Sequence, residues 1–199
     1  MELEVRLLPR QLEAWRHVGK GKYIFYGGAR GGGKSHLARA AAVLAAHMWP
    51  GIRVVCVRTT YPELYENFIT RILEDYPGDV WGYVYRARER VMLFENGSKI
   101  FFRPIDSEIA LKKVLGLEYQ FMVIDEANVL PENYIHRIRG SLRRPVGNFI
   151  PTMLMTGNPG GVSDTYFKTR FVEPDYSYWG KNELSEKDRY VFVPAKVYD

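Results

Sequence analysis

The 199-residue sequence predicts an α/β fold, with a mainly parallel β-sheet and helices on both of its faces. Two observations support this prediction. Short, continuously apolar segments alternate along the chain with longer segments of helical periodicity. In addition, glycine or acidic residues follow several of the apolar segments directly, where ligands gather at the carboxyl edge of such a sheet. The length suits a single domain over residues 1–199.

The first half of the chain contains two strand–helix units. Residues 23–26 form an apolar strand, and the alanine-rich segment 34–48 is predicted to be a helix that ends before Pro50-Gly51. Residues 53–58 indicate a second buried strand. Residues 61–76 place their large apolar side chains at helical spacing, which predicts another helix.

The second half begins with a different pattern. Alternating polar and apolar residues between 80 and 102, interrupted by Asn96-Gly97, predict a β-hairpin insertion. Further along, the pattern weakens after Val162. The remaining predicted elements are a strand over 121–124, a helix over 131–142, a strand over 152–155 and an edge strand over 190–193.

Composition limits the class of protein. The net charge of +5 is compatible with a nucleic-acid partner but is weak evidence for one. The single cysteine, Cys56, lies in an apolar strand and is expected to be a buried thiol. The start of the chain has no apolar signal segment, and the longest apolar stretch, Ala40 to Ala46, is too short to span a bilayer. We therefore expect an intracellular protein with no membrane association.

A phosphate-binding loop is the strongest motif. Residues 28–35 match the pattern G-x-x-x-x-G-K-[ST] between a strand and a helix. Glycines allow backbone amides to approach phosphate oxygens, and the helix start adds a positive dipole end. Lys34 would contact the terminal phosphates of ATP, and the Ser35 hydroxyl would bind Mg²⁺. The residues predicted to bind ATP in this loop are Gly28, Ala29, Arg30, Gly31, Gly32, Gly33, Lys34 and Ser35.

Two adjacent acids follow the apolar segment 121–124. Asp125 is predicted to join Ser35 at Mg²⁺, and Glu126 to activate the water that attacks the terminal phosphate. An acid in the second position is common in ATPases that perform mechanical work, whereas kinases and small GTPases usually lack it. A solvated turn is the alternative explanation for these acids.

Two further polar segments lie near the predicted site. Thr156-Gly157-Asn158-Pro159 ends a strand and is expected to lie beside the terminal phosphate, although a simple Asn-Pro turn explains it as well. Gln11 precedes the first strand, and its amide could recognise both hydrogen-bonding edges of adenine. An ordinary helix-start glutamine is the alternative for that residue.

Arginines are less specific. Arg30 lies inside the phosphate loop and is expected near the nucleotide or the catalytic acid. Two clusters, Arg86, Arg88 and Arg90 on a predicted hairpin strand and Arg137, Arg139, Arg143 and Arg144, could supply an arginine finger or contact DNA phosphates. Solvated surfaces explain most such clusters.

Together these motifs resemble the ATPase domain of phage terminase large subunits, which are ASCE-type P-loop NTPases that package viral DNA. Pro9-Arg10-Gln11 resembles the adenine-binding motif, and residues 28–35 resemble a phosphate loop with an embedded arginine. Residues 94–103 are similar to the hairpin segment, 123–127 to the Walker B motif and 156–159 to the coupling motif. The resemblance extends from about Leu8 to Phe171.

The resemblance implies roles that the spacing alone does not give. Thr156, Gly157 and Asn158 would couple hydrolysis to DNA movement, Arg30 would act as a sensor or finger in cis, and Arg88 or Arg90 could reach the ATP of a neighbouring subunit. The implied partners are double-stranded DNA, a portal protein and a small terminase subunit. The motor would be a homo-oligomeric ring in the cytoplasm of the infected bacterial host, with the isolated domain monomeric. The family's carboxyl-terminal nuclease domain is expected to be absent from this chain.

We therefore expect a chain that hydrolyses Mg-ATP to translocate double-stranded DNA into a procapsid. Its catalytic residues would be Glu126, Lys34 and Arg30, and its metal-binding residues Ser35 and Asp125. Other interpretations are a helicase-like motor, a small-molecule phosphotransferase and a non-catalytic nucleotide- or DNA-binding module.

Overall fold

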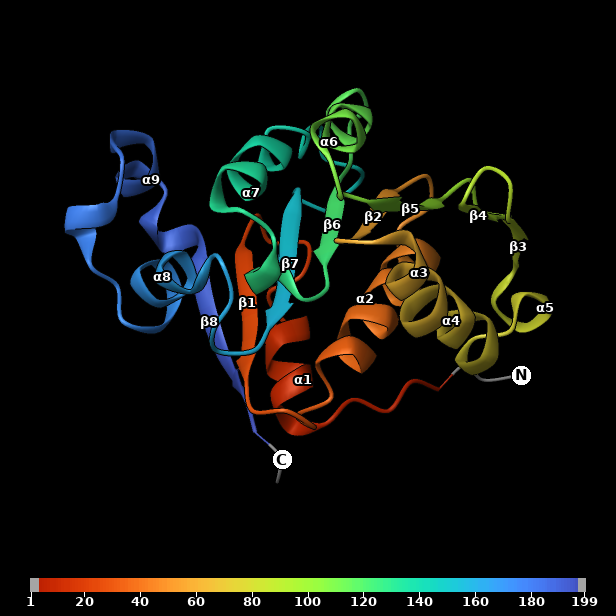
Figure 1. Ribbon diagram of the computed structural model, residues 1–199. Coiled ribbons are helices and arrows are strands. Elements are labelled where there is room, and N and C mark those ends of the chain that lie inside the picture. The colour runs from red at the N-terminus through yellow and green to blue at the C-terminus, as the bar shows by residue number, and fades with distance from the viewer. Residues whose placement is uncertain (1–3, 197–199) are drawn as a thin grey trace.

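The computed structural model describes residues 4–196 and contains one eight-stranded sheet (Figure 1). The strand order is β3-β4-β5-β2-β6-β7-β1-β8, and the six strands from β5 to β8 in that order run parallel. The strands are β1 Tyr23–Gly28, β2 Arg53–Arg58, β3 Tyr83–Arg86, β4 Val91–Phe94, β5 Lys99–Pro104, β6 Phe121–Ile124, β7 Thr152–Gly157 and β8 Tyr190–Ala195.

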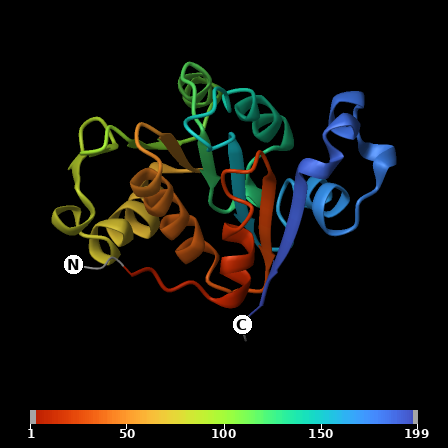
Figure 2. The same ribbon diagram turned by 180° about the vertical axis from the view of Figure 1, so that it is seen from behind.

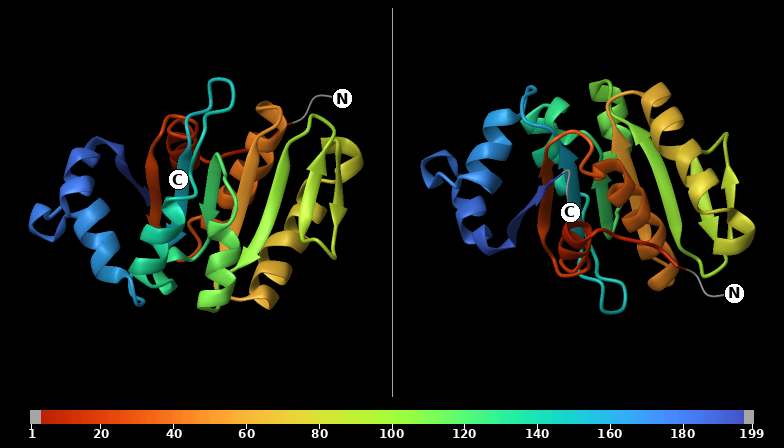
Figure 3. Two further views of the ribbon diagram at one scale, coloured as in Figure 1. Left: turned by 90° about the horizontal axis from the view of Figure 1, so that it is seen from above. Right: turned by 90° about the horizontal axis from the view of Figure 1, so that it is seen from below.

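Helices connect these strands and cover both faces of the sheet, as Figures 2 and 3 show from other sides. The longest, α2, follows the phosphate loop and buries an alanine-rich face against the sheet. The α-helices are α1 Pro9–Trp15, α2 Lys34–Met48, α3 Tyr61–Leu64, α4 Thr70–Asp75, α5 Gly78–Trp81, α6 Glu108–Leu115, α7 Glu132–Arg139, α8 Asp164–Phe167 and α9 Lys181–Ser185. The π and 3₁₀ segments are η1 Tyr65–Ile69, η2 Ala127–Val129, η3 Lys168–Val172, η4 Tyr176–Tyr178 and η5 Lys187–Arg189.

Two separate apolar cores lie on the two faces of the sheet. The first packs α1, α2 and the α3–η1–α4 helix against side chains such as Ile24 and Tyr26 of β1. The second packs α6, α7 and the α8–η3 helix against Tyr23 and Phe25 of the same strand. Alternate residues of a strand point to opposite faces, so a continuously apolar strand is buried on both. The predicted parallel sheet with helices on both faces is therefore confirmed.

The predicted hairpin is confirmed, but it extends the main sheet and does not stand apart from it. β4 and β5 pair antiparallel across the Asn96-Gly97 turn, and β5 also pairs parallel with β2. Asn96 Nδ2 donates hydrogen bonds to the carbonyl oxygens of Ala46 and His47, at the end of α2. The hairpin turn therefore lies at the sheet edge opposite the phosphate loop, which is at the start of α2.

One predicted location is wrong. Arg88 and Arg90 were expected on a hairpin strand, but β3 ends at Arg86 and both arginines lie in the turn that leads to β4. Arg90 has a φ of +56°, a left-handed conformation that a strand does not contain. Its guanidinium carbon lies 3.8 Å from the centre of the Tyr61 ring, so a cation–π contact replaces the predicted strand pairing.

Two other elements differ from the predictions or refine them. Helix α6 was not predicted; it begins after Ser107, whose side chain accepts a hydrogen bond from the backbone N–H of Ala110. The predicted edge strand is confirmed as β8, which pairs parallel with β1 along its whole length. Within residues 4–196, no helix combines the length and the apolar composition needed to cross a membrane.

Candidate functional site

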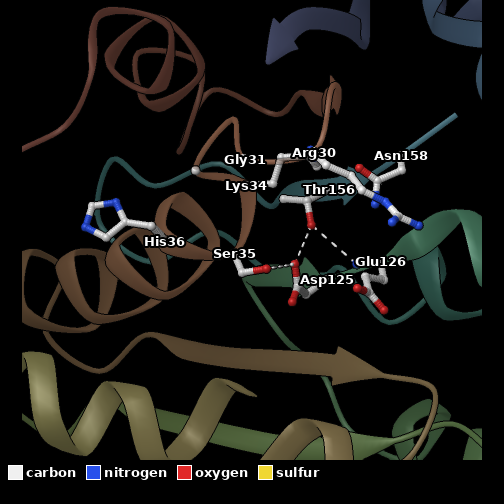
Figure 4. A pocket seen from close by; sticks show the side chains of 11 residues that line it. Arg30, Gly31, Lys34, Ser35, His36, Asp125, Glu126, Thr156 and Asn158 are labelled. Carbon is white, nitrogen blue, oxygen red and sulfur yellow. Dashed lines mark hydrogen bonds between the residues drawn. The ribbon is translucent and has the colours of Figure 1, made fainter. Parts of the chain in front are cut away.

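A polar cavity lies at the carboxyl edge of the sheet, where β1, β6 and β7 are neighbours (Figure 4). It has a volume of about 510 Å³. The phosphate loop and the start of α2 form one side, and residues that follow β6 or lie at the end of β7 form the other. Its lining residues are Arg30, Gly31, Gly33, Lys34, Ser35, His36, Asp125, Glu126, Thr156, Gly157 and Asn158. The structure thus brings together most of the residues that the motifs predicted.

Two glycines of the phosphate loop are required by its packing. Gly33 has a φ of +64°, and a Cβ there would lie 2.3 Å from Gln11 Nε2. Gly28 has a φ of +141°, and a Cβ there would lie 2.6 Å from the carbonyl oxygen of Ala195. Any larger residue would therefore strain the loop. The backbone N–H of Ala29 donates a 3.3 Å hydrogen bond to the carbonyl oxygen of Ala195, so β8 supports the loop from outside.

Lys34 is held inside the phosphate loop. Its Nζ donates hydrogen bonds to the carbonyl oxygens of Gly28, at 3.3 Å, and Ala29. Burial lowers the pKa of the Lys34 ammonium, and the nearby charges of Asp125 and Glu126 oppose that change. Phosphate oxygens are stronger partners for an ammonium group than neutral carbonyls, so this side chain is suited to exchange one set for the other.

Ser35, Asp125 and Thr156 form a connected set of oxygen atoms. Asp125 Oδ1 accepts hydrogen bonds from Ser35 Oγ at 3.1 Å and from Thr156 Oγ1 at 2.6 Å. Hydroxyl and carboxylate oxygens are the ligands that Mg²⁺ takes, and in proteins Mg²⁺ usually binds one or two carboxylates, water and phosphate oxygens. Among residues 4–196 there is no group of three or more His, Cys, Asp or Glu that could hold a metal. The Ser35 and Asp125 oxygens suit an ion that completes its shell with phosphate and water oxygens.

Glu126 has an unusual backbone conformation. Its φ is +57°, a left-handed value that is uncommon outside glycine and frequent at functional sites. The N–H of Glu126 donates a 3.3 Å hydrogen bond to Thr156 Oγ1, so the same hydroxyl orients both acids. The Glu126 side chain is 44% exposed, which leaves its carboxylate accessible from the cavity.

Arg58 is a site residue that the sequence did not identify. It ends β2, its side chain is only 5% exposed, and it contacts both acids. Arg58 Nη2 lies 2.9 Å from Glu126 Oε1, and Arg58 Nε lies 3.2 Å from Asp125 Oδ2 in an ion pair that is not aligned as a hydrogen bond. This arginine belongs to none of the motifs described above. One sequence feature could have identified Arg58: it is a charged residue at the end of a buried strand, β2. This strand pairs with β6, which the two acids follow.

Asn128 is a second residue that sequence reasoning missed. Its Nδ2 donates to the carbonyl oxygen of Gly160 at 3.0 Å, and its Oδ1 accepts from the N–H of Asn158 at 3.3 Å. A Cβ on Gly157 would lie 2.9 Å from Asn128 Oδ1, so this glycine is needed for the approach. Asn128 thereby joins the loop after β6 to the loop after β7.

Residues 156–159, at the carboxyl end of β7, lie beside the acids. Thr156 contacts them directly, and Asn158 lines the cavity. Asn158 Oδ1 is buried and has no hydrogen-bond partner among the residues that the structure describes. It is therefore free to accept a bond from a ligand or a water.

Gln11 does not line the cavity. Its Nε2 donates to the carbonyl oxygen of Gly33 at 3.0 Å, and its Oε1 accepts from the N–H of Leu8 at 2.9 Å. These bonds join α1 to the phosphate loop, and the adenine contact remains a prediction. Arg30 is exposed and lines the cavity beside Asn158 (Figure 4).

The second arginine cluster is bound to local partners away from the cavity. Arg137 Nη1 lies 2.6 Å from Glu108 Oε1, and Arg144 Nε lies 3.2 Å from Glu118 Oε2. Arg139 donates a 2.7 Å hydrogen bond to the Tyr190 hydroxyl. These arginines therefore contact residues that do not line the cavity.

The thiol of Cys56 lies inside the sheet. Its side chain is fully buried in β2, as the sequence predicted. Burial raises the pKa of this thiol, and the nearby charge of Asp125 acts in the same direction. Cys56 is therefore a core residue and takes no part in the cavity.

Comparison with known proteins gives a consistent family. A family model described as the phage terminase large subunit matches residues 20–196, whereas no curated protein matches the sequence. The large terminase of a thermophilic bacteriophage is 16% identical, with a TM-score of 0.70 over 98% of this chain and 47% of that one. The same terminase in complex with ATP-γ-S is 14% identical, with a TM-score of 0.67 over 96% of this chain and 45% of that one.

A third structure covers a similar length. The large terminase ATPase domain of Thermus phage P74-26 is 17% identical, with a TM-score of 0.65 over 95% of this chain and 80% of that one. At these identities the similarity concerns the fold. This chain spans less than half the length of the thermophilic phage protein.

Proposed function

The chain belongs to the phage terminase large-subunit family, and on that premise we propose that it hydrolyses Mg-ATP to move double-stranded DNA into a procapsid. The observation that carries the proposal is the convergence on one cavity of the phosphate loop, the paired acids and Thr156, which orients both acids. A phosphate loop alone would serve many reactions. A carboxylate beside the predicted position of the terminal phosphate favours direct attack by water.

Each side chain has a defined task in this proposal. Lys34 would leave its loop carbonyls and contact the terminal phosphates. Ser35 and Asp125 would hold Mg²⁺, which, when bound, neutralises charge on the phosphate oxygens. Glu126 would accept a hydrogen bond from the attacking water and orient it toward the phosphorus. Asn158 and the exposed Arg30 would contact the terminal phosphate or the water from the side of β7.

Nucleotide binding has support from the family. The large terminase of the thermophilic bacteriophage is described in complexes with ATP-γ-S and with ADP. We extend this binding to the present chain, with Gly28 to Ser35 around the phosphates and Gln11 near adenine. Gln11 keeps one donor hydrogen and one acceptor lone pair beyond the two bonds that it makes.

Assembly and partners follow from the family premise. The proposed motor is a ring of such subunits on a portal protein, in the cytoplasm of the infected host, with a small terminase subunit delivering DNA. The proposal covers residues 1–199 as one ATPase domain and assigns DNA cleavage to none of them.

The geometry of the sheet favours action of Arg88 or Arg90 on a neighbouring subunit. β4 is separated from β1 by five strand positions, on the order of 24 Å at about 4.8 Å per strand. The turn before β4 nevertheless lies at the carboxyl edge, since the N–H of Phe102 donates to the carbonyl oxygen of Arg90. These arginines are therefore too far from the phosphate loop of their own chain to contact its ATP. They lie at the carboxyl edge of the sheet, where they could contact the ATP of a neighbouring subunit.

The test of hydrolysis is Glu126→Gln, with Glu118→Gln as a control for loss of a surface carboxylate. Phosphate release is measured with and without double-stranded DNA, at protein concentrations that allow subunits to associate. We expect Glu126→Gln to retain Mg-ATP binding and to lose at least about 100-fold in turnover. Turnover near the wild-type rate in that variant would refute the role of Glu126, and a wild-type chain that binds Mg-ATP without cleaving it would refute hydrolysis.

The test of the trans finger is subunit mixing. Arg88→Ala and Lys34→Ala chains are each expected to be inactive alone. Partial recovery of turnover on mixing is the expected result, because an intact site can then receive an intact arginine. Lack of recovery would instead favour Arg30 acting in cis.

A further inference from the structure

A second polar cavity adjoins the nucleotide cavity. It has a volume of about 310 Å³ and is lined by Ser35, Arg39, Arg58, Asn67, Arg71 and Glu126. We call it the arginine chamber. Ser35 and Glu126 line both cavities, so the two spaces meet at the residues that hold the metal and the attacking water in the proposed mechanism.

Residues of α2, β2 and the continuous η1–α4 helix build the walls of the arginine chamber, together with Glu126 after β6. Ser35 and Arg39 are four residues apart on α2, and Asn67 and Arg71 are four residues apart on the neighbouring helix, so each pair shares a helix face. Arg58 closes the chamber from the end of β2. Arg39 Nη1 donates a 3.2 Å hydrogen bond to the Asn67 carbonyl oxygen and so fixes the two helices together.

Guanidinium groups make up half of the chamber lining. Three guanidinium groups line the chamber against the single carboxylate of Glu126. All three of these guanidinium groups also have carboxylate neighbours outside the lining, and Arg58 Nε lies 3.2 Å from Asp125 Oδ2. Arg39 Nη2 lies 3.7 Å from Asp75 Oδ2, and Arg71 Nη1 lies 2.9 Å from Glu74 Oε2.

Hydrogen bonding in the chamber is incomplete. Arg39 Nε and Arg58 Nε are buried without a hydrogen-bond acceptor among the described residues. The Arg58 side chain is 5% exposed and the Arg39 side chain 13% exposed. Buried charged donors without acceptors are unfavourable, and an ion with several acceptor oxygens would satisfy them.

We propose that the arginine chamber binds inorganic phosphate after ATP cleavage and is its route out of the site. The inference rests on the proposed hydrolysis. In that reaction the water oxygen bonds to the γ-phosphorus, and the bond from phosphorus to the β,γ-bridging oxygen breaks. The products are ADP, hydrogen phosphate and a proton that passes to solvent. The phosphate then leaves the phosphate loop past Ser35 and Glu126, while ADP stays bound.

The lining distinguishes phosphate from a nucleotide. It contains no apolar or aromatic side chain against which a base could stack. The chamber is also far larger than the roughly 10–15 Å³ that one water needs, so a phosphate ion fits with part of its hydration. Glu126 repels the anion, and Asp75, Glu74 and Asp125 compete for the three arginines. Binding is therefore weak and reversible, as a release route requires.

The test measures phosphate binding by the chain saturated with Mg-ADP, using equilibrium dialysis with radiolabelled orthophosphate. The variants are Arg39→Gln, Arg71→Gln and the double variant, and Arg137→Gln is the control for a surface arginine outside the chamber. We expect the wild type and the control to bind phosphate equally. Each chamber variant should weaken phosphate binding by about tenfold, with ADP affinity unchanged. The Arg71 side chain is 61% exposed, so Arg71→Gln is expected to fold even if Arg39→Gln does not fold.

The outcomes separate this inference from the proposed function. A chain that binds neither ADP nor ATP contradicts the proposed function. A chain that binds ADP, but binds phosphate no more weakly in the chamber variants than in the control, overturns the chamber. Loss of phosphate binding only in Lys34→Ala overturns it too, because the ion would then occupy the phosphate loop.

Discussion

Two buried arginines face carboxylates in this protein, and they differ in how completely they are bonded. The Arg58 side chain at the nucleotide cavity is 5% exposed, and the Arg170 side chain in η3 is 6% exposed. Each forms ion pairs with two acids. Arg58 contacts Asp125 and Glu126, whereas Arg170 contacts Glu183 and, at 3.7 Å, Glu132.

Every nitrogen of the Arg170 guanidinium has a hydrogen-bond acceptor. Nε and Nη2 donate to the two oxygens of Glu183 at 3.2 Å, Nη1 donates to Thr169 Oγ1 at 2.9 Å, and Nη2 also donates to the Tyr178 carbonyl oxygen. The ring of Trp179 packs beside it. Burial raises the pKa of the Glu183 carboxyl, but the bonds and charge of Arg170 outweigh burial and lower that pKa overall. This pair is a structural element.

Arg58 is bonded incompletely. Its Nη1 donates to the Glu63 carbonyl oxygen at 3.2 Å, but its Nε and Asp125 Oδ2 both lack an aligned hydrogen bond within residues 4–196. Side chains and backbone of the protein satisfy the hydrogen bonds of Arg170, whereas at Arg58 a ligand could supply the missing hydrogen bonds. At the cavity, Arg58 Nε, Asp125 Oδ2 and Asn158 Oδ1 are unsatisfied within the part of the chain that the structure describes, whereas the fully bonded Arg170 connects the 164–189 segment to Glu132 of α7.

The largest expected effect on stability is at the structural pair. Arg170→Met leaves Glu183 buried and unpaired, so the free energy of unfolding should fall by about 3–5 kcal/mol in urea denaturation. The double variant Arg170→Met/Glu183→Leu should recover part of this loss because no uncompensated charge remains. A loss under about 1 kcal/mol in the single variant would mean that the pair is not structural.

A smaller loss is expected at the cavity. Arg58→Met should lower the free energy of unfolding by about 1–3 kcal/mol. Glu126 is 44% exposed and can be hydrated, and Asp125 Oδ1 keeps its bonds from Ser35 and Thr156. The same urea titration applies. If Arg58→Met costs as much as Arg170→Met, the contrast between the two arginines is wrong.

Removing one hydroxyl from the cavity should cost less still. Thr156→Val keeps the side-chain shape but removes the donor to Asp125 and the acceptor for the Glu126 N–H. We expect a loss of about 1–2 kcal/mol in the free energy of unfolding, with reduced turnover because both acids lose their orientation. Thr165→Val, at an exposed position, is the control. Unchanged turnover in Thr156→Val would mean that catalysis does not require this hydroxyl.

The smallest effect is a dependence on pH. Burial lowers the pKa of His36 in the cavity and of His17 below the ordinary value of 6.5. Protonation is thus less favourable in the folded state, and stability should be complete above pH 6.5 and decrease as pH falls through the folded pKa. Thermal unfolding between about pH 5 and 8 tests this, and the decrease should be smaller in His17→Asn/His36→Asn. An equal decrease in that variant would assign the dependence to other groups.

The sequence predicted the site where backbone motifs define it. The glycines of residues 28–33 and the acids after β6 act through local conformation and position at a strand end, so spacing alone locates them. Arg58 and Asn128 act through contacts with loops distant in sequence, which no local pattern records. The prediction for Arg88 and Arg90 was wrong for a similar reason, because the alternation of residue types does not show that the strand ends and a turn begins.

We expect the phosphate loop and its acids to bind Mg-nucleotide. The most direct test is the thermal unfolding midpoint of the 199-residue chain with Mg-ATP-γ-S at about 100 times its dissociation constant. We predict stabilisation of about 2.7 kcal/mol, which corresponds to a rise of roughly 5–10 °C in wild type. Arg170→Met should show a similar rise from a lower baseline, and Lys34→Ala almost none. An equal rise in Lys34→Ala, or no rise in wild type, would contradict the account.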